Sequence, residues 1–175
     1  MDEGGLYWIV DGLVKKRVGS GTESTLAVTP QANAMVVDNE AIYVASKHGL
    51  LRVSKRTRET AVLVEGETLQ LAADAESLFW ADRGTLFRTS KESGETLQVG
   101  PSSMCTTIDA LSLDEDRIFA LCGFGGGERL IMLPKVGGCP VSLRSRVHLP
   151  ATIRASGEAL FWSESAGEGI QRIVP

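Results

Sequence analysis

A short apolar strand with an aromatic residue near its start recurs five times along the 175-residue chain. The central copy is Leu78–Asp82, with the sequence Leu-Phe-Trp-Ala-Asp. The aromatic residues of the five copies are Tyr7, Tyr43, Phe79, Phe119 and Phe161, at successive intervals of 36, 36, 40 and 42 residues. Self-similarity at a nearly constant period is the sequence signature of a repeat architecture. The chain is therefore predicted to be a tandem repeat of one supersecondary unit.

The residues around each aromatic predict four short strands per unit. A turn follows the aromatic strand and leads to a second strand, whose basic residue comes nine positions after the aromatic in the first three copies. A third strand follows, and a fourth one precedes the next aromatic. Three copies of the fourth strand end in Asp before a turn, where a carboxylate can accept hydrogen bonds from the turn's own backbone. These residues are Asp38, Asp74 and Asp114.

Short strands at this spacing, with turn signals between them and no helical periodicity, predict an all-β fold. A four-stranded unit of about 40 residues in tandem is typical of a β-propeller blade. We expect a single β-propeller domain over 1–175, with about five four-stranded blade units of which the first and last are incomplete. The units are expected at about 1–30, 31–66, 67–102, 103–148 and 149–175. Three arrangements are open: an arc of a larger propeller, a small five-bladed ring, or an arc that a second chain completes.

The segments Tyr7–Asp11 and Phe79–Asp82 resemble the YWTD repeat of low-density-lipoprotein-receptor-type propellers, and Phe161–Glu164 is a weaker copy. The run Leu133–Leu143 is similar to the end of the repeat in bacterial propeller proteins of this kind. The second and fourth copies lack both the Trp and the Asp. The resemblance implies a bacterial YWTD-like propeller, here a partial one, since intact YWTD propellers have six blades. It implies no particular activity, because propellers host many unrelated functions.

Charge and hydropathy exclude several classes of partner. The formal net charge of −4 disfavours nucleic acid, which requires clustered Lys and Arg. No apolar run reaches the roughly 20 residues that span a bilayer. The N-terminal residues lack the basic and apolar regions of a signal peptide. We expect a soluble chain without an export signal, although its localisation stays open because proteins of the resembling kind are often secreted or periplasmic.

The chain has three cysteines, Cys105, Cys122 and Cys139. An odd number leaves at least one thiol free or bonded to another molecule. The favoured interpretation is three free thiols, and the alternative is one disulfide with one free thiol. The spacing contains no Cys-x-x-Cys pair, which disfavours zinc.

Two sets of recurrent residues are the candidate binding positions. Acidic residues end the aromatic strands, and arginines recur on the strand that follows. The candidates are Asp11, Asp82, Glu164, Arg52, Arg88 and Arg172. In the resembling family the matching Asp organises neighbouring blades through hydrogen bonds, and a calcium-binding ring of carboxylates is the alternative. The arginines are expected to pair with those carboxylates or with an acidic ligand.

The remaining features favour packing and loops over catalysis. The aromatic residues are expected to fill the space between blades, with sugar stacking as the alternative. The glycine-rich segment Gly123–Glu128 is expected to be a hairpin loop that can contribute to a binding face. The sequence has only two histidines and no motif of a hydrolase or metalloprotease.

We therefore expect a non-enzymatic propeller scaffold for a protein, small-molecule or carbohydrate ligand, without a cofactor, that self-associates into a homo-oligomer. The alternatives are a calcium- or other metal-dependent propeller enzyme of the gluconolactonase or lyase type, and a carbohydrate-binding propeller.

Overall fold

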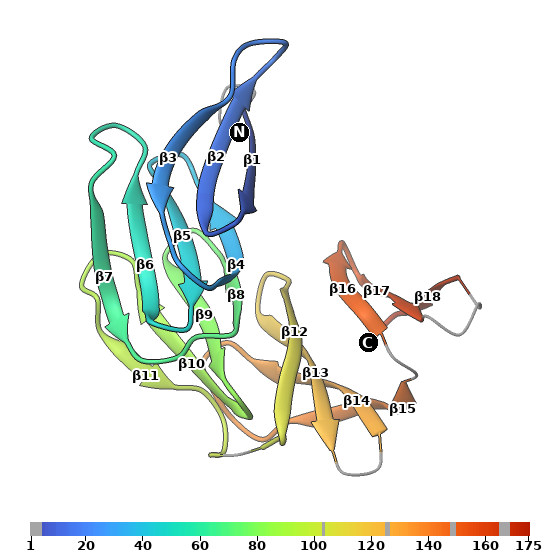
Figure 1. Ribbon diagram of the computed structural model, residues 1–175. Coiled ribbons are helices and arrows are strands. Elements are labelled where there is room, and N and C mark those ends of the chain that lie inside the picture. Colours follow the sequence, from blue (N-terminus) through green and yellow to red (C-terminus); the bar gives the residue numbers. More distant parts are fainter. Residues whose placement is uncertain (1–4, 103, 125–126, 148–149, 165–168) are drawn as a thin grey trace. The chain divides into compact units, whose positions relative to one another are not determined.

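The computed structural model describes residues 5–102, 104–124, 127–147, 150–164 and 169–175. Within these ranges all regular elements are β-strands, arranged in five antiparallel sheets (Figure 1). Three of the sheets have four strands, whereas the first and the last have three. The all-β prediction is confirmed, and the sheets have the size and strand order of propeller blades. The chain divides into two compact units, Met1–Leu71 and Ala72–Pro175.

The first unit contains two sheets in which strands that follow one another in sequence also pair. The first sheet has the order β1-β2-β3 and the second has the order β4-β5-β6-β7. The strands are β1 (Gly5–Val10), β2 (Leu13–Val18), β3 (Ser24–Val28), β4 (Ala32–Val37), β5 (Ala41–Ser46), β6 (Gly49–Ser54) and β7 (Thr60–Glu65).

The second unit contains three sheets of the same meander type, and the first strand of its first sheet, β8 (Gln70–Ala73), begins at the end of the first unit. The orders are β8-β9-β10-β11, β12-β13-β14-β15 and β16-β17-β18. The further strands are β9 (Ser77–Asp82), β10 (Thr85–Ser90), β11 (Thr96–Gln98), β12 (Thr107–Leu113), β13 (Arg117–Phe124), β14 (Gly127–Pro134), β15 (Val141–Val147), β16 (Pro150–Ser156), β17 (Ala159–Glu164) and β18 (Ile170–Ile173).

The nine-residue spacing between aromatic and basic residues reflects the register of the hairpins. Each basic residue lies directly opposite the aromatic of its own hairpin, so both side chains project from one face of the sheet. The opposed pairs at this spacing are Tyr7 with Lys16, Tyr43 with Arg52 and Phe79 with Arg88. In the last sheet, whose turn is longer, Phe161 lies opposite Arg172. The Lys16 ammonium lies 5.1 Å from the centre of the Tyr7 ring, within cation–π range. In the fourth copy Met132 takes the basic residue's place opposite Phe119.

The predicted Asp turns are confirmed in all three four-stranded sheets. The side-chain oxygen of Asp38 accepts hydrogen bonds from the backbone amides of Glu40 (3.0 Å) and Ala41 (2.9 Å). Asp74 and Asp114 accept the corresponding pairs of bonds in their own turns. Because the carboxylate satisfies turn amides that have no strand partner, it fixes the connection between the first two strands of each sheet.

The aromatic residues pack between neighbouring sheets, as expected. In the second unit Phe79, 1% exposed, belongs to one hydrophobic cluster with Ile118 and Leu133 of the next sheet. Phe119 forms a second cluster with Leu160 of the sheet after that. The tryptophan of the central copy packs differently. The Trp80 ring stacks on Phe87 of its own sheet at 4.4 Å, and its Nε1 donates to Thr89 Oγ1 (2.9 Å).

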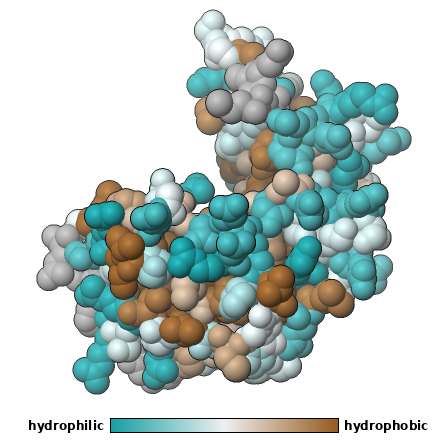
Figure 2. Space-filling model, turned by 180° about the vertical axis from the view of Figure 1, so that it is seen from behind, coloured by the Kyte–Doolittle hydropathy of each residue, from teal (hydrophilic) through white to brown (hydrophobic). Residues whose placement is uncertain are grey.

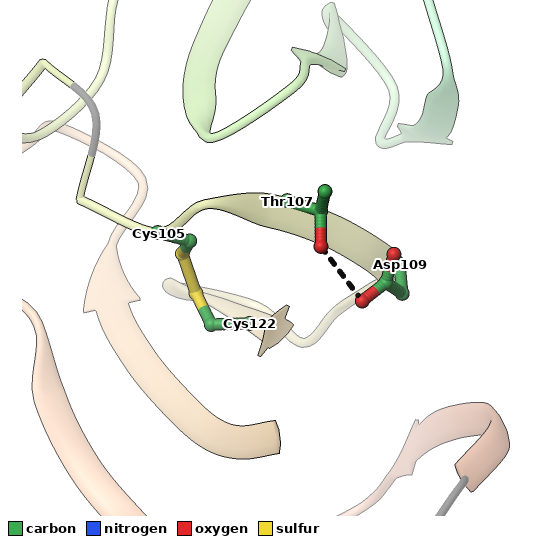
Figure 3. Close-up of a disulfide and its surroundings, with 4 residues drawn as sticks. All are labelled: Cys105, Thr107, Asp109 and Cys122. Atoms are coloured by element: carbon green, nitrogen blue, oxygen red, sulfur yellow. Dashed lines mark hydrogen bonds between the residues drawn. A yellow bond between two sulfur atoms is a disulfide. The ribbon is translucent and has the colours of Figure 1, made fainter. Parts of the chain in front are cut away.

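The cysteines correct the favoured expectation of three free thiols. Cys105 and Cys122 form a disulfide with a Cα–Cα distance of 5.3 Å, whereas Cys139 is free and exposed. The bond fastens the segment that enters β12 to the neighbouring strand β13, beside the hydrogen bond from Thr107 Oγ1 to Asp109 (Figure 3). The sequence spacing was compatible with this pairing but did not select it.

Candidate functional site

The six candidate residues belong to four different sheets or their turns, with Asp11 and Arg52 in the first unit and the other four in the second. Asp11 is exposed in the turn between β1 and β2, and Asp82 ends β9. Glu164 ends β17, but its side chain lies outside the described residues. In the part of the chain that the structure describes, no three His, Cys, Asp or Glu side chains are grouped to hold a metal ion.

The three arginines make contacts inside their own sheets. Arg88 Nε donates to Ser77 Oγ (2.8 Å), and the Arg172 guanidinium lies 6.0 Å from the centre of the Phe161 ring. Arg52 lies near Glu40, with 4.0 Å between its Nη2 and the Glu40 Oε2. Arg52 also lines a groove together with other cations.

This groove, which we call the basic groove, has a volume of about 650 Å³. It lies at the end of the second sheet where β4 turns into β5 and β6 turns into β7. The turn between β4 and β5 and the turn between β6 and β7 form its walls. Its lining residues are Asn39, Glu40, Arg52, Ser54, Lys55, Arg56, Thr57, Glu59 and Ala61. Three are cations and two are carboxylates, so the groove carries a net positive charge in a chain whose net charge is −4.

Arg52 is held in the groove by its position in a cross-strand row. Tyr43, Arg52 and Ala61 lie opposite one another on β5, β6 and β7. Burial and the negative charge of Asp38 raise the pKa of the Tyr43 hydroxyl, although a hydrogen bond with Arg52 works against them. Tyr43 therefore stays neutral and gives Arg52 a fixed hydrogen-bonding neighbour. The Arg52 side chain remains 35% exposed and accessible to a ligand.

Lys55 places a second cation at the same end of the sheet. Its ammonium donates a hydrogen bond to the Asp38 carbonyl oxygen and lies 4.8 Å from the centre of the Tyr7 ring of the first sheet. Its backbone amide donates to the Glu40 carbonyl (3.0 Å). Lys55 thus joins both walls of the groove to the neighbouring sheet, and its charge has a fixed position.

The turn between β6 and β7 is closed by its own polar side chains. The backbone amide of Thr57 donates to Ser54 Oγ (3.1 Å), and the Thr57 hydroxyl donates to a carboxylate oxygen of Glu59 (3.0 Å). Arg56 is exposed on this turn. One carboxylate of the groove is therefore engaged by a hydroxyl, and Arg56 places an exposed cation at the rim.

In the third and fourth sheets the corresponding rows end on larger side chains. The row of Arg88 ends on Leu97, and that of Met132 ends on Val141. In the second sheet the small Ala61 leaves room beside Arg52. The sequence did contain this signal, since the third-strand copies are Thr25-Leu26, Thr60-Ala61 and Thr96-Leu97. Of the residues that line the groove, Arg52 alone is among the candidates predicted from the sequence.

Two further grooves lie in the second unit. One, of about 540 Å³, is lined mainly by acidic residues, including Asp114, Glu115, Asp116 and Glu158. The other, of about 490 Å³, contains Asp82 together with Arg83, Cys105 and Phe124. The glycine-rich segment borders this region, but its Gly125 and Gly126 lie outside the described residues.

The exposed apolar residues are distributed over many strands. On the face shown in Figure 2, hydrophobic and hydrophilic side chains are interspersed. The largest exposed fractions belong to residues of different sheets, such as Val28 (67%), Val136 (90%) and Ile170 (76%). Among the described residues no helix is long and apolar enough to cross a membrane. Because the most exposed apolar side chains lie on different sheets, the polar basic groove is the better candidate site.

Comparison with known proteins identifies the fold. No family model matches the sequence, and no curated protein matches it. The structure is similar to a solved structure of a nidogen/laminin complex, with a TM-score of 0.80, 12% identity and coverage of 98% of this chain and 72% of that one. It is also similar to the extracellular domain of the putative hybrid two-component system BT4673 from B. thetaiotaomicron, with a TM-score of 0.72, 12% identity and coverage of 97% of this chain.

A third similar structure is PorZ, a surface component of the type-IX secretion system of Porphyromonas gingivalis, with a TM-score of 0.66, 13% identity and coverage of 98% of this chain. This chain spans 26% of the BT4673 domain and 26% of PorZ. At these identities the likeness concerns the fold alone, and together with the five antiparallel sheets it supports a propeller-like fold.

Proposed function

We propose that this chain is a non-enzymatic, propeller-like scaffold that binds a protein or another ligand through the basic groove. The observation that carries the proposal is the groove itself, in which Arg52, Lys55 and Arg56 converge beside the small Ala61. The turns that form its walls are fixed by Asp38 and Ser54, so the cations are presented by a preorganised surface. One of the similar structures is a complex of two proteins, nidogen and laminin, which is consistent with a binding role for this kind of fold.

We also propose that the five sheets are blades of one YWTD-like domain over 1–175, with the unit boundaries expected from the repeat. In this proposal Asp11, Asp82, Glu164, Arg88 and Arg172 organise neighbouring blades or their loop faces. A second copy of the chain completes the ring. In support, the first and last sheets have three described strands where the others have four. The outer edges of such sheets carry unpaired backbone groups that accept another strand.

The disulfide supports a location outside the reducing cytosol. Disulfides such as Cys105–Cys122 form and persist mainly in oxidising compartments. Two of the similar structures are an extracellular domain and a bacterial surface component. We therefore propose a bacterial protein that functions at the cell surface or beyond it.

The binding role is tested with arrays of peptides and saccharides probed by the wild-type chain and by Ala61→Leu. The larger side chain occupies the space beside Arg52, in the position that Leu97 has opposite Arg88 in the third sheet. We expect at least one ligand that the wild type retains and Ala61→Leu loses. Equal retention of every ligand by both proteins would contradict the proposal.

Self-association and the enzymatic alternative have separate tests. Sedimentation velocity should show a dimer or a larger assembly, and a monomer at all concentrations would exclude ring completion by a second copy. Assays with lactones and uronide polymers, with and without calcium, should show no turnover. Calcium-dependent turnover would favour the enzyme of the gluconolactonase or lyase type.

A further inference from the structure

We infer that the ligand of the basic groove is an extended acidic peptide segment, which pairs with the outer edge of β7 and places carboxylates beside Arg52 and Arg56. This inference rests on the proposed binding role of the groove and specifies the chemistry of its ligand. Charge, space and an unpaired strand edge support it independently.

The charge of the groove favours carboxylates. A planar guanidinium presents parallel donors that match the two oxygens of a carboxylate. The groove already contains such a pair in a loose form, because the Glu40 carboxylate lies 4.0 Å from Arg52 while its side chain is 86% exposed. Glu40 therefore shows where a carboxylate fits. An incoming carboxylate can displace the Glu40 carboxylate from Arg52 at little cost, because in the part of the chain that the structure describes the exposed Glu40 side chain is held only by this loose contact.

The space beside Arg52 fits a side chain from outside. The row Tyr43–Arg52–Ala61 runs across the sheet to its outer strand, and Ala61 itself is exposed. A longer residue at this position would cover the guanidinium. With Ala61 in place, a ligand lying alongside β7 can reach Arg52 from the edge of the sheet.

The edge of β7 indicates a peptide rather than a saccharide. β7 ends the order β4-β5-β6-β7, and it has no outer neighbour among the described strands. Thr60, Ala61 and Val62 on this strand are exposed. Unpaired backbone groups along an accessible strand can accept an extended peptide as a further strand. Successive residues of the added peptide strand would point to opposite faces of the sheet. Acidic residues at every second position of the peptide would therefore all face the groove.

The same geometry disfavours dense polyanions. Glu40 and Glu59 also line the groove, and they would repel a nucleic acid or a polyphosphate, whose charges follow one another closely. An acidic peptide has its carboxylates on flexible side chains, separated by uncharged residues. It can therefore approach Arg52 and Arg56 without confronting Glu59.

The experiment uses fluorescence anisotropy with the full chain and a labelled peptide of alternating glutamate and threonine. A peptide with glutamine in place of glutamate controls for charge, and an N-methylated version of the acidic peptide controls for backbone pairing. We expect binding of the acidic peptide alone. Arg52→Gln and Arg56→Gln should each weaken it about tenfold, as expected for the loss of a charge-assisted hydrogen bond.

Two further variants separate the groove from general charge effects. Arg58→Gln removes the same charge from the same turn, but Arg58 does not line the groove, and binding should stay at the wild-type level. Ala61→Leu keeps every charge and should abolish binding by filling the space. Circular dichroism melts of each variant confirm that the chain is folded.

Several results would overturn the inference: equal binding of the glutamine peptide, full binding of the N-methylated peptide, or an equal loss in Arg56→Gln and Arg58→Gln. Oligogalacturonate, which carries carboxylates without a peptide backbone, is the competing probe. If it binds more tightly than the peptide and Ala61→Leu abolishes that binding, the groove is a binding site but its ligand is not a peptide. The proposed function would then stand while this inference fails.

Discussion

The ammonium group of Lys135, which directly follows β14, donates a hydrogen bond of 2.8 Å to the carboxylate of Asp74, which directly follows β8. The two side chains are 13% and 31% exposed. The same ammonium lies 5.7 Å from the centre of the Phe79 ring. One lysine of the fourth sheet therefore contacts both the turn carboxylate and the packing aromatic of the third. Lys55 lies over Tyr7 in the first unit, so a cation over the preceding sheet's aromatic occurs in both units.

Replacement of Lys135 by methionine should destabilise the fold by about 1–2 kcal/mol at pH 7, because a hydrogen bond to a partly buried charge is lost. Burial acts to raise the pKa of Asp74, but the hydrogen bonds from Lys135 and from the Ser77 and Glu76 amides outweigh it and lower the pKa. The carboxylate therefore stabilises the fold above its unfolded-state pKa, and this contribution disappears as the pH falls through the lower folded-state pKa.

Urea denaturation over a range of pH measures this effect. The difference between Lys135→Met and the wild type should narrow as the solution is acidified toward the pKa of Asp74. Lys47→Met removes an exposed lysine and should change stability little at any pH. If Lys135→Met lowers the stability by the same amount at every pH, the stabilising contribution of Lys135 comes from its packing over Phe79 and not from its ion pair with Asp74.

Replacement of Glu128 by glutamine should stabilise the protein at neutral pH. The Oε2 of Glu128 is buried and has no hydrogen-bond partner in the described part of the chain. Burial raises the pKa of Glu128, and the negative charge of Asp109 raises it further. A carboxyl group whose folded-state pKa is raised destabilises the fold as the pH rises above its unfolded-state pKa.

The measurement is again the urea midpoint, at pH 7 and below pH 4. At pH 7 the urea midpoint of Glu128→Gln should be higher than that of the wild type. The difference between the midpoints should shrink at the lower pH, where Glu128 is protonated in both the folded and the unfolded state. Glu92→Gln changes an exposed turn residue and serves as the control. A lower midpoint for Glu128→Gln at pH 7 would contradict the unfavourable environment assigned to the carboxylate.

Reduction of the disulfide should cost about 3 kcal/mol of stability, the loop-entropy value for a crosslink of this sequence separation, 17 residues. The variant Cys105→Ala with Cys122→Ala should lose a similar amount and become insensitive to reductant. Thiol titration of the native, oxidised chain should give one reactive group, which Cys139→Ser removes without a change in stability. Three reactive thiols in a freshly purified, untreated sample would exclude the bond.

The sequence predicted the features that are local in the chain. The register of Tyr43 with Arg52 follows from a hairpin, and the Asp38 turn involves residues two and three positions away, so a repeated pattern is enough to reveal both. The packing of Phe79 was also predictable, because a large ring in every unit needs a neighbouring sheet to bury it.

The contacts between distant residues were not predictable in this way. Lys135 and Asp74 are 61 positions apart, and their meeting depends on how one sheet packs on the next. Three cysteines permit three different pairings, and the spacing alone does not choose between them. The basic groove depends on Ala61, whose importance is the space that it leaves beside Arg52. The sequence shows the alanine where two other copies have leucine, but that difference indicates a groove only once the cross-strand register with Arg52 is known.

Gly84 provides a last test of the packing around the disulfide. It is buried in the turn between β9 and β10, and a Cβ atom there would overlap the backbone carbonyl oxygen of Cys105. The backbone amide of Ile108 donates to the Arg83 carbonyl (2.8 Å) and holds the two segments together, so neither can move away freely. Gly84→Ala should therefore destabilise the protein by about 2 kcal/mol or more, the size of an overpacked core substitution.

Gly94→Ala is the control. A Cβ atom at Gly94 would meet no atom within 4 Å, but the backbone there has a φ of 74°, so this substitution should lower the stability by only about 1 kcal/mol. Thermal melts of the two variants compare the costs directly, and a Gly84→Ala protein as stable as Gly94→Ala would contradict the close approach of this turn to Cys105.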